Sequence, residues 1–534
     1  MNIAKRNGVK SRIPKRVRRI LILLIWLLLW QLLATLIHNR ILFVGPAEAF
    51  AALWKQLPTS EFWRTVWHSS LRICSGYLLA FFLGVLSGIV AYKKWYVEEF
   101  LEPAVALLQS VPVASFVILA LIWIGSKNLA VLISFVIVFP VIYRNTLQGM
   151  KEADVQLLEM ADVFGMSAWS RFWYVYRPSL FPYLLAGSRT ACGMAWKSGV
   201  AAEVIGVPDL SIGEKLYMAK IYLSTAELFA WTFVVIVVSR LLERAFLWVM
   251  GQVSVERLKA GREKDVKRTG IVDRKQRSVT GKEMAVVDRK RWSIMKKRSE
   301  AGIDGSWAAA SVQVQSLSKS YGEKQVLSDL SLSLEAGQIY CLMGTSGIGK
   351  TTLLRILLGL EMPDAAADGV GLETSDVAVG NVDLTMFAAG SVEMYPESAI
   401  SAVFQENRLL GYADAVENIV VAGKRRGLCY APQEVLQDLL EPEAWQKQTE
   451  LLSGGMQRRV AIARALAVRS NLILMDEPFT GLDEETRRRT IQQILKFRAG
   501  RTLLVVTHQE EDAQLLGAQV LRITSAAARK EAQD

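Results

Sequence analysis

The sequence predicts a chain of two parts, an all-α domain of membrane-spanning helices followed by an α/β domain that contains a phosphate-binding loop. Residues 1 to about 250 contain several long apolar runs, as membrane spans do. Residues 312–525 mix charged and apolar positions as a soluble domain does, and the stretch 344–352 carries a glycine-rich motif. With 534 residues the chain is also too long for one ordinary core.

The stretch 344–352 fits the phosphate-loop pattern G-x-x-x-x-G-K-[ST]. It has the context that the motif needs, because an apolar run at 338–343 precedes it and a helical pattern at 353–360 follows it. Backbone N–H groups of such a loop surround phosphate oxygens, the lysine adds a positive charge, and the next threonine offers a hydroxyl to Mg²⁺. A glycine-rich turn that binds nothing is the alternative. The predicted ATP-binding residues of the loop are Gly344, Thr345, Ser346, Gly347, Ile348, Gly349, Lys350, Thr351 and Thr352.

Six apolar segments predict six membrane spans. The first, Ile20–Ile37, follows a basic N-terminus as a secretory signal would, but no small-residue cleavage site follows it, so we expect a retained span. The basic tail and the basic residues of the loop 144–182 place the N-terminus and the α/β domain in the cytoplasm. The other predicted spans are about Ile73–Ala91, Pro103–Ile124, Leu129–Tyr143, Tyr183–Ala202 and Leu228–Leu242.

The basic residues gather in two short segments. Residues 251–300 hold 16 Lys and Arg against 7 Asp and Glu, and residues 1–20 hold 8 basic residues and no acidic ones. Without them the formal charge of +12 becomes −5. This favours contact with the cytoplasm and with lipid headgroups over a nucleic-acid groove, although solvated charge runs would look the same. The predicted division is a basic cytoplasmic tail at 1–19, a transmembrane domain at 20–250, a basic linker at 251–310 and a nucleotide-binding domain at 311–526.

The four cysteines, scattered along the chain, form no C-x-x-C pair, so neither a disulfide framework nor a zinc site is indicated. A reduced cytoplasm suits them. They are Cys74, Cys192, Cys341 and Cys429.

Lys197 lies well inside the fifth predicted span, where an ammonium group is costly unless it faces a cavity or a partner. Small residues lie around it at helical spacing, which suits close helix contact or a pore wall, and Trp196 is expected to point elsewhere, toward lipid. We therefore predict that Lys197 lines a substrate path. Snorkelling of Lys197 to the outer headgroups is the alternative. The small residues are Cys192, Gly193, Ala201 and Ala202.

The loop 144–182 contains the run E-M-A-D-V-F-G at 159–165. This run resembles the EAA loop of bacterial ABC importer permeases, whose short helix docks on the ATPase and transmits its movement, although Met160 and Asp162 depart from the pattern. The segments 46–48, 110–116 and 201–206 are also similar to permeases of the nitrate/sulfonate/taurine class. An ordinary polar loop is the alternative. The coupling residues that the resemblance implies are Glu159, Ala161 and Gly165.

Motifs after the phosphate loop resemble those of ABC ATPases. An apolar strand at 472–477 ends in two carboxylates, so that Asp476 would hold Mg²⁺ through water and Glu477 would polarise the attacking water. His508 follows a strand-like run and resembles the switch histidine, a structural histidine being the alternative. Gln405 matches the Q-loop glutamine, which in the family senses Mg²⁺ and the γ-phosphate.

Further positions complete this resemblance. The signature motif at 452–457 opens a helix whose donors point at an anion, and in the family this motif caps the γ-phosphate held by the opposite subunit. The run 481–483 fits the D-loop, and an aromatic before the second strand stacks on adenine in the family. The ATP-binding residues implied are Tyr321, Ser453, Gly454, Gly455 and Asp483.

The resemblance implies an all-α six-helix transmembrane permease domain followed by an α/β P-loop ABC ATPase domain. It further implies a half-transporter that pairs as a homodimer, uses ATP and Mg²⁺, and receives a small anionic solute from an extracytoplasmic solute-binding protein for import across the cytoplasmic membrane. An ABC exporter and a membrane-anchored regulatory ATPase are the alternatives. The alanine- and glycine-rich segment Asp364–Gly390 looks long for the family and 405–453 looks short, which implies an altered edge sheet and a trimmed helical subdomain.

Overall fold

The computed structural model describes residues 15–37, 39, 41–252, 309–364, 391–395 and 399–523. Most of the predicted basic tail, nearly all of the predicted linker and residues 365–390 of the alanine- and glycine-rich segment lie outside the described residues. The chain forms two compact units. The first takes its described residues from Met1–Glu152 and Ser179–Val266, and the second from Ala153–Pro178 and Lys267–Asp534.

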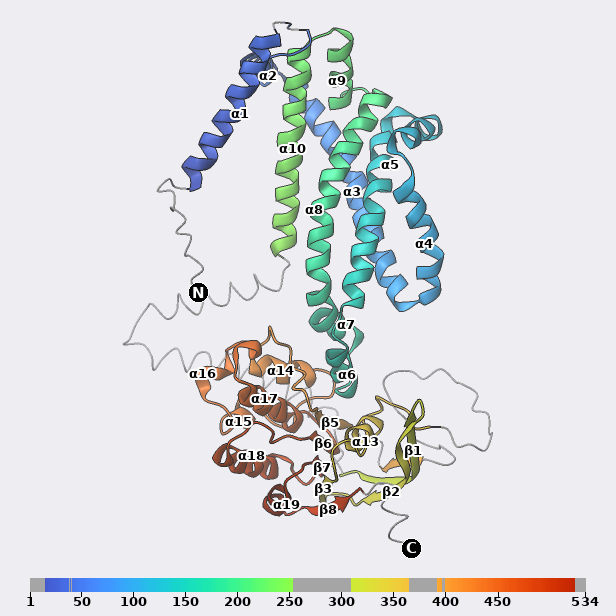
Figure 1. The fold of residues 1–534 in the computed structure, drawn as a ribbon, viewed down its shortest axis with the longest axis vertical. Helices are drawn as coiled ribbons and strands as arrows, with labels where there is room; N and C mark the ends of the chain where they lie inside the picture. The colour runs from blue at the N-terminus through green and yellow to red at the C-terminus, as the bar shows by residue number, and fades with distance from the viewer. Residues whose placement is uncertain are drawn as a thin grey trace, which may run out of the picture. The chain divides into compact units, whose positions relative to one another are not determined.

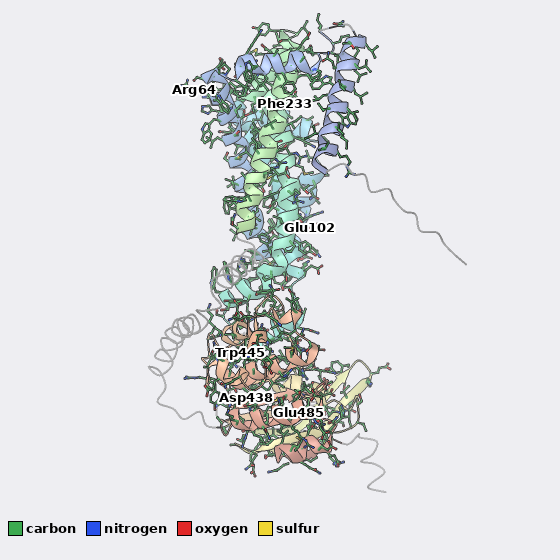
Figure 2. All side chains as sticks on the ribbon, turned by 90° about the vertical axis from the view of Figure 1, so that its left-hand side faces the viewer. Arg64, Glu102, Phe233, Asp438, Trp445 and Glu485 are labelled. Atoms are coloured by element: carbon green, nitrogen blue, oxygen red, sulfur yellow. The ribbon has the colours of Figure 1, made fainter. Side chains whose placement is uncertain are left out.

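The first unit is all-helical (Figure 1). Among the described residues, three of its helices are long and apolar enough by length and composition to cross a membrane, over Ile20–Ile37, Ser60–Lys93 and Val113–Lys151. The outer faces carry large apolar side chains such as that of Phe233, which is 41% exposed (Figure 2). Its helices are α1 (Lys15–Ile37), α2 (Pro46–Gln56), α3 (Ser60–Lys93), α4 (Trp95–Ser110), α5 (Val113–Lys151), α8 (Arg177–Gly206), α9 (Ile212–Ile221) and α10 (Thr225–Gln252).

The predicted third span, Pro103–Ile124, is wrong. Helix α4 ends at Ser110, and α5 begins only after Pro112. Proline lacks a backbone N–H and keeps the preceding residue out of the helical region, so the chain breaks at this point. A second break follows at Gly125, whose φ of 70° favours glycine and divides α5 into two pieces.

The surroundings of Lys197 on α8 differ in part from the prediction. Lys197, Gly193 and Ala201 do lie on the less buried face of α8, with Lys197 and Ala201 exposed. Cys192 and Ala202 belong instead to the buried face. Trp196 is only 4% exposed and packs in the core of the first unit, so the expectation that it points to lipid is wrong.

The second unit contains two sheets. A three-stranded antiparallel sheet has the order β2-β1-β4, and a five-stranded parallel sheet has the order β5-β6-β7-β3-β8. Strands β3, β6 and β7 are buried along their whole length, as central strands of a parallel sheet covered on both faces must be. The strands are β1 (Ser311–Tyr321), β2 (Lys324–Leu334), β3 (Ile339–Met343), β4 (Ser391–Tyr395), β5 (Ile400–Val403), β6 (Leu472–Asp476), β7 (Thr502–Val506) and β8 (Gln519–Arg522).

The helices of the second unit lie between its strands, except for α6, α7 and η1, which lie between α5 and α8 in the chain. The region 405–453, predicted to be short, holds only brief helices, and the longest helices of the unit are α17 and α18. The segment between α5 and α8 folds with this unit. The helices are α6 (Val155–Val163), α7 (Ala168–Arg171), η1 (Phe172–Tyr176), α13 (Lys350–Leu357), α14 (Ala415–Ala422), α15 (Pro432–Leu436), α16 (Pro442–Trp445), η2 (Thr449–Leu451), α17 (Gly454–Ala467), α18 (Glu484–Phe497) and α19 (Glu510–Leu516).

Candidate functional site

The phosphate loop joins β3 to α13 at the carboxyl end of the parallel sheet, where ligands of such sheets bind. Gly347 and Gly349 adopt φ of 80° and 101°, and a Cβ at Gly349 would lie 2.6 Å from Leu327 Cδ2. Lys350 is 6% exposed, and its ammonium donates to the carbonyls of Gly344 at 2.8 Å and Thr345 at 2.9 Å. Burial lowers the pKa of Lys350, while the nearby carboxylates raise it. The ammonium group of Lys350 thus holds the backbone of the loop through these two hydrogen bonds.

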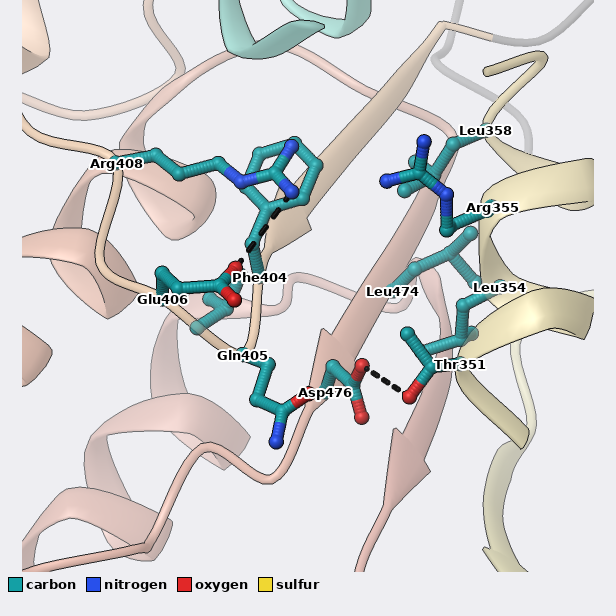
Figure 3. A pocket seen from close by; sticks show the side chains of 11 residues that line it. Thr351, Leu354, Arg355, Leu358, Phe404, Gln405, Glu406, Arg408, Leu474 and Asp476 are labelled. Carbon is teal, nitrogen blue, oxygen red and sulfur yellow. Dashed lines mark hydrogen bonds and ion pairs between the residues drawn. The ribbon is translucent and has the colours of Figure 1, made fainter. Parts of the chain in front are cut away.

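The predicted Mg²⁺ ligands lie together. The Thr351 hydroxyl donates to Asp476 Oδ2 at 3.0 Å, and the Gln405 side chain reaches toward the same carboxylate from the end of β5 (Figure 3). Burial raises the pKa of Asp476, and the hydrogen bond from Thr351 opposes this. A buried carboxylate beside a hydroxyl and an amide oxygen is an oxygen set that suits Mg²⁺. These residues therefore fit the metal that the sequence implied.

Glu477 and His508 follow neighbouring strands β6 and β7. His508 Nε2 lies 2.7 Å from Glu477 Oε1, and the Glu477 N–H donates to the Val506 carbonyl at 3.0 Å. Glu477 has a φ of 46°, which is strained for a residue with a side chain and is common at functional sites. The structure thus brings together Glu477, predicted to polarise the attacking water, and His508, predicted as the switch histidine.

Glu159 of α6 makes ion pairs with two arginines of the nucleotide-binding fold. Its carboxylate accepts from Arg355 at 2.7 and 3.1 Å and from Arg408 at 2.6 Å. Arg355 lies on α13, directly after the phosphate loop, and Arg408 lies three residues beyond Gln405. Burial alone would raise the pKa of Glu159, but hydrogen bonds and charge from the two arginines lower it overall. The contact is therefore fully present above the ordinary glutamate pKa and weakens only in acid.

Apolar packing accompanies these ion pairs. Ala161 is fully buried, and it shares one hydrophobic cluster with Phe164 and with Phe404 of the Q-loop. Gly165 has a φ of 61°, and a Cβ there would lie 3.0 Å from Arg426 Nε. The predicted coupling residues Glu159, Ala161 and Gly165 thus all lie in this contact. The connection between the two helices is shorter than the predicted loop 144–182, because α5 continues to Lys151 and α8 begins at Arg177.

The other predicted ATP-binding residues occupy helix ends and a strand end. Ser453 caps α17 by accepting from the Met456 N–H at 3.3 Å, and Asp483 caps α18 by accepting from the Thr486 N–H at 2.9 Å. Within the described part of the chain, neither side chain has a hydrogen bond to the phosphate loop. Tyr321 is 48% exposed at the end of β1, and its hydroxyl bonds to Glu361.

Sequence reasoning missed several arginines that hold these parts together. Arg355 and Arg408 carry no motif of their own. The sequence does carry a signal for Arg464, because every other residue of the run 460–467 in α17 is apolar, which indicates a buried position. It is fully buried, donates to the carbonyls of Arg408 at 2.7 Å and Asn407 at 3.3 Å, and lies 5.0 Å from the centroid of the Phe164 ring.

Comparison with known proteins agrees with this geometry. A family profile described as ABC transporter matches residues 327–480, and one described as binding-protein-dependent transport system inner membrane component matches residues 80–249. The aliphatic sulfonates import ATP-binding protein SsuB 2 of Burkholderia cenocepacia is 36% identical over 208 residues, covering 38% of this chain and 70% of that protein. The chain belongs to the ABC transporter family. It joins a permease domain to an ABC ATPase domain in one polypeptide.

Other ABC proteins match over the same region. The Fe(3+) ions import ATP-binding protein FbpC 1 of Rhizobium meliloti is 35% identical over 213 residues, which is 39% of this chain and 56% of that protein. The chain thus spans little more than half the length of this relative. The dimeric ATP-binding cassette MJ0796 with ADP and Pi is 27% identical, with a TM-score of 0.32 and coverage of 40% of this chain and 94% of that one.

Substitution of Glu477 by Gln tests the assignment of the ABC ATPase site. The Glu477→Gln protein is expected to bind ATP and to hydrolyse it at least about a hundredfold more slowly, because the general base is lost. Steady-state phosphate release and nucleotide binding measure this. Glu484→Gln, which removes an exposed carboxylate paired with Arg488, is the matched control and should hydrolyse normally. Turnover near that of the control would remove Glu477 from the role.

Proposed function

We propose that the chain is an ATP-driven importer half that works as a homodimer in the cytoplasmic membrane. The contact of Glu159 with Arg355 and Arg408 carries this proposal, because it joins a segment between two permease helices to both the helix after the phosphate loop and the Q-loop. A change in the nucleotide site can move that segment through these ion pairs. The family match of the permease domain supports transport as the purpose of the movement.

In this proposal each residue of the site has a defined task. The loop around Lys350 binds the ATP phosphates, and Thr351, Asp476 and Gln405 would hold Mg²⁺, which supplies charge neutralisation when bound. Glu477 accepts a proton from the attacking water while His508 holds its carboxylate in place. Ser453 and the glycines after it complete the site of a second copy, so that two ATP molecules bind between two chains.

A small anion is the proposed substrate. Arg189 and Lys197 both lie on the exposed face of α8, eight residues and about two helical turns apart. Cations on a membrane helix are costly against lipid, and their shared face suits a path that attracts negative charge. One relative of the ATPase domain is named for sulfonate import and another for iron import, so similarity alone does not choose an anion. The proposal of an anionic substrate therefore depends also on the two cations of α8.

The remaining parts of the proposal concern partners and orientation. We place the N-terminus and the ATPase domain in the cytoplasm, the helices of the first unit across the membrane in contact with lipid, and a solute-binding protein on the outer side. Nucleic acid has no role in it. An ABC exporter would move substrate outward without a binding protein, and a membrane-anchored regulatory ATPase would move none.

The coupling contact predicts a loss of transport without a loss of ATP hydrolysis. In proteoliposomes with a solute-binding protein, the wild type should accumulate solute with ATP, and Glu159→Gln should reduce the solute taken up per ATP about fivefold or more, the lower end of typical coupling energies. Glu152→Gln, an exposed carboxylate at the end of α5, is the control. Solute extrusion would favour an exporter, and ATP hydrolysis without any solute movement would favour a regulatory ATPase.

The composite site predicts recovery in a mixed dimer. When Lys350→Ala and Ser453→Ala chains are combined, both lesions of the mixed dimer fall in one site and the other site remains intact. The rate of ATP hydrolysis by the purified mixed dimer should exceed that of either single variant if one intact site can hydrolyse ATP alone. Absence of recovery would show that both sites are needed, whereas full activity of isolated monomers would refute the dimer.

The anion path predicts that the charge of Lys197 matters for transport. Lys197→Met keeps length and removes charge, so uptake of an anionic solute should fall while basal ATP hydrolysis and membrane insertion persist. Lys127→Met removes an exposed lysine from α5 and serves as the control. Uptake that is unaltered across substrate concentrations would reject the anion role and leave snorkelling as the explanation for Lys197.

A further inference from the structure

Arg458 lies in the first two turns of α17, directly behind the catalytic residues. It is 4% exposed, and one of its guanidinium nitrogens donates to the carbonyls of Phe404 and of Gln405, the latter at 3.1 Å. The other donates to the carbonyls of Asp476 and Glu477, both at 2.5 Å. One side chain therefore holds the end of β5 and the end of β6 together.

Through these carbonyls Arg458 contacts the backbone that carries the catalytic side chain of Glu477. Glu477 has left-handed backbone geometry, and its carbonyl is fixed by Arg458 while its N–H is fixed by Val506. Strained backbone persists only where the surroundings hold it. Without the guanidinium, the turn after Asp476 could relax and carry the Glu477 carboxylate away from His508.

A lysine or an amide cannot replace this group. A guanidinium presents its donors in a planar fork, and here two of its nitrogens donate to four carbonyl oxygens at the ends of two strands. Burial lowers the pKa of Arg458, and the charges of Asp476 and Glu477 oppose this. The charge of Arg458 is thus balanced by the carboxylates that it positions.

We propose that Arg458 is a positioning residue for ATP hydrolysis, which fixes the Q-loop to the Asp476–Glu477 turn and so holds Glu477 in its reactive geometry. This inference rests on the proposed ATPase function. It concerns the rate of hydrolysis rather than nucleotide binding, because Arg458 contacts backbone carbonyls and no residue of the phosphate loop among the described residues.

The test measures kcat and KM for ATP in the full-length protein. Arg458→Gln and Arg458→Lys are both expected to lower kcat about tenfold to a hundredfold, the scale of a small misplacement of a catalytic group, and to leave KM within about threefold. The matched control is Arg501→Gln, since Arg501 is also a buried arginine that donates to backbone carbonyls, those of Val468, Leu466 and Phe497, but away from the site. The control should lower thermal stability and keep kcat per folded molecule.

A double variant separates positioning from a general structural role. In the Glu477→Gln background, adding Arg458→Gln should lower the residual kcat by less than about threefold, because Arg458 acts through Glu477. If Arg458→Gln does not fold, the same comparison is made with Arg458→Lys. An unchanged kcat, a change in KM alone, or full additivity with Glu477→Gln would overturn the inference. A wild-type protein without ATP hydrolysis would instead refute the proposed function itself.

Discussion

The carboxylate of Glu159 holds two guanidinium groups that belong to different parts of the nucleotide site. Arg355 follows the phosphate loop, whereas Arg408 follows Gln405, so the distance between these parts is tied to one side chain of α6. The three groups are only partly exposed, and two neighbouring cations without the carboxylate would repel each other. Ala161 and Phe164, which follow Glu159 in the chain, pack in one hydrophobic cluster with Phe404.

Buried arginines continue the same arrangement into the ATPase fold. Arg464 and Arg458 lie six positions apart on α17 and donate to backbone carbonyls of the segment 404–408. The segment 404–408 is therefore held by charged side chains of both α6 and α17, and the partners of the two α17 arginines are mostly backbone oxygens. Such partners keep their place when side chains are exchanged, which makes the geometry insensitive to the local sequence.

The sequence predicted best where chemistry demands fixed spacing. The phosphate loop, the Asp476–Glu477 pair and His508 were found because each follows a recognisable apolar strand, and the parallel sheet then brings their ends together. The third span was misplaced because hydropathy does not register the backbone restrictions at Pro112 and Gly125. The contacts of Arg355, Arg408 and Arg458 could not be predicted, since they join positions far apart in the chain and follow no periodicity.

The segment Ala153–Pro178 folds with the ATPase although it is encoded between two permease helices. The chain therefore passes between its two units at both ends of this segment, so an element encoded within the permease is part of the ATPase fold. Because the permease and the ATPase are one polypeptide, their association is intramolecular and does not depend on protein concentration. Each permease thus keeps a dedicated ATPase in fixed one-to-one stoichiometry, and exchange with the ATPase subunits of other transporters is suppressed.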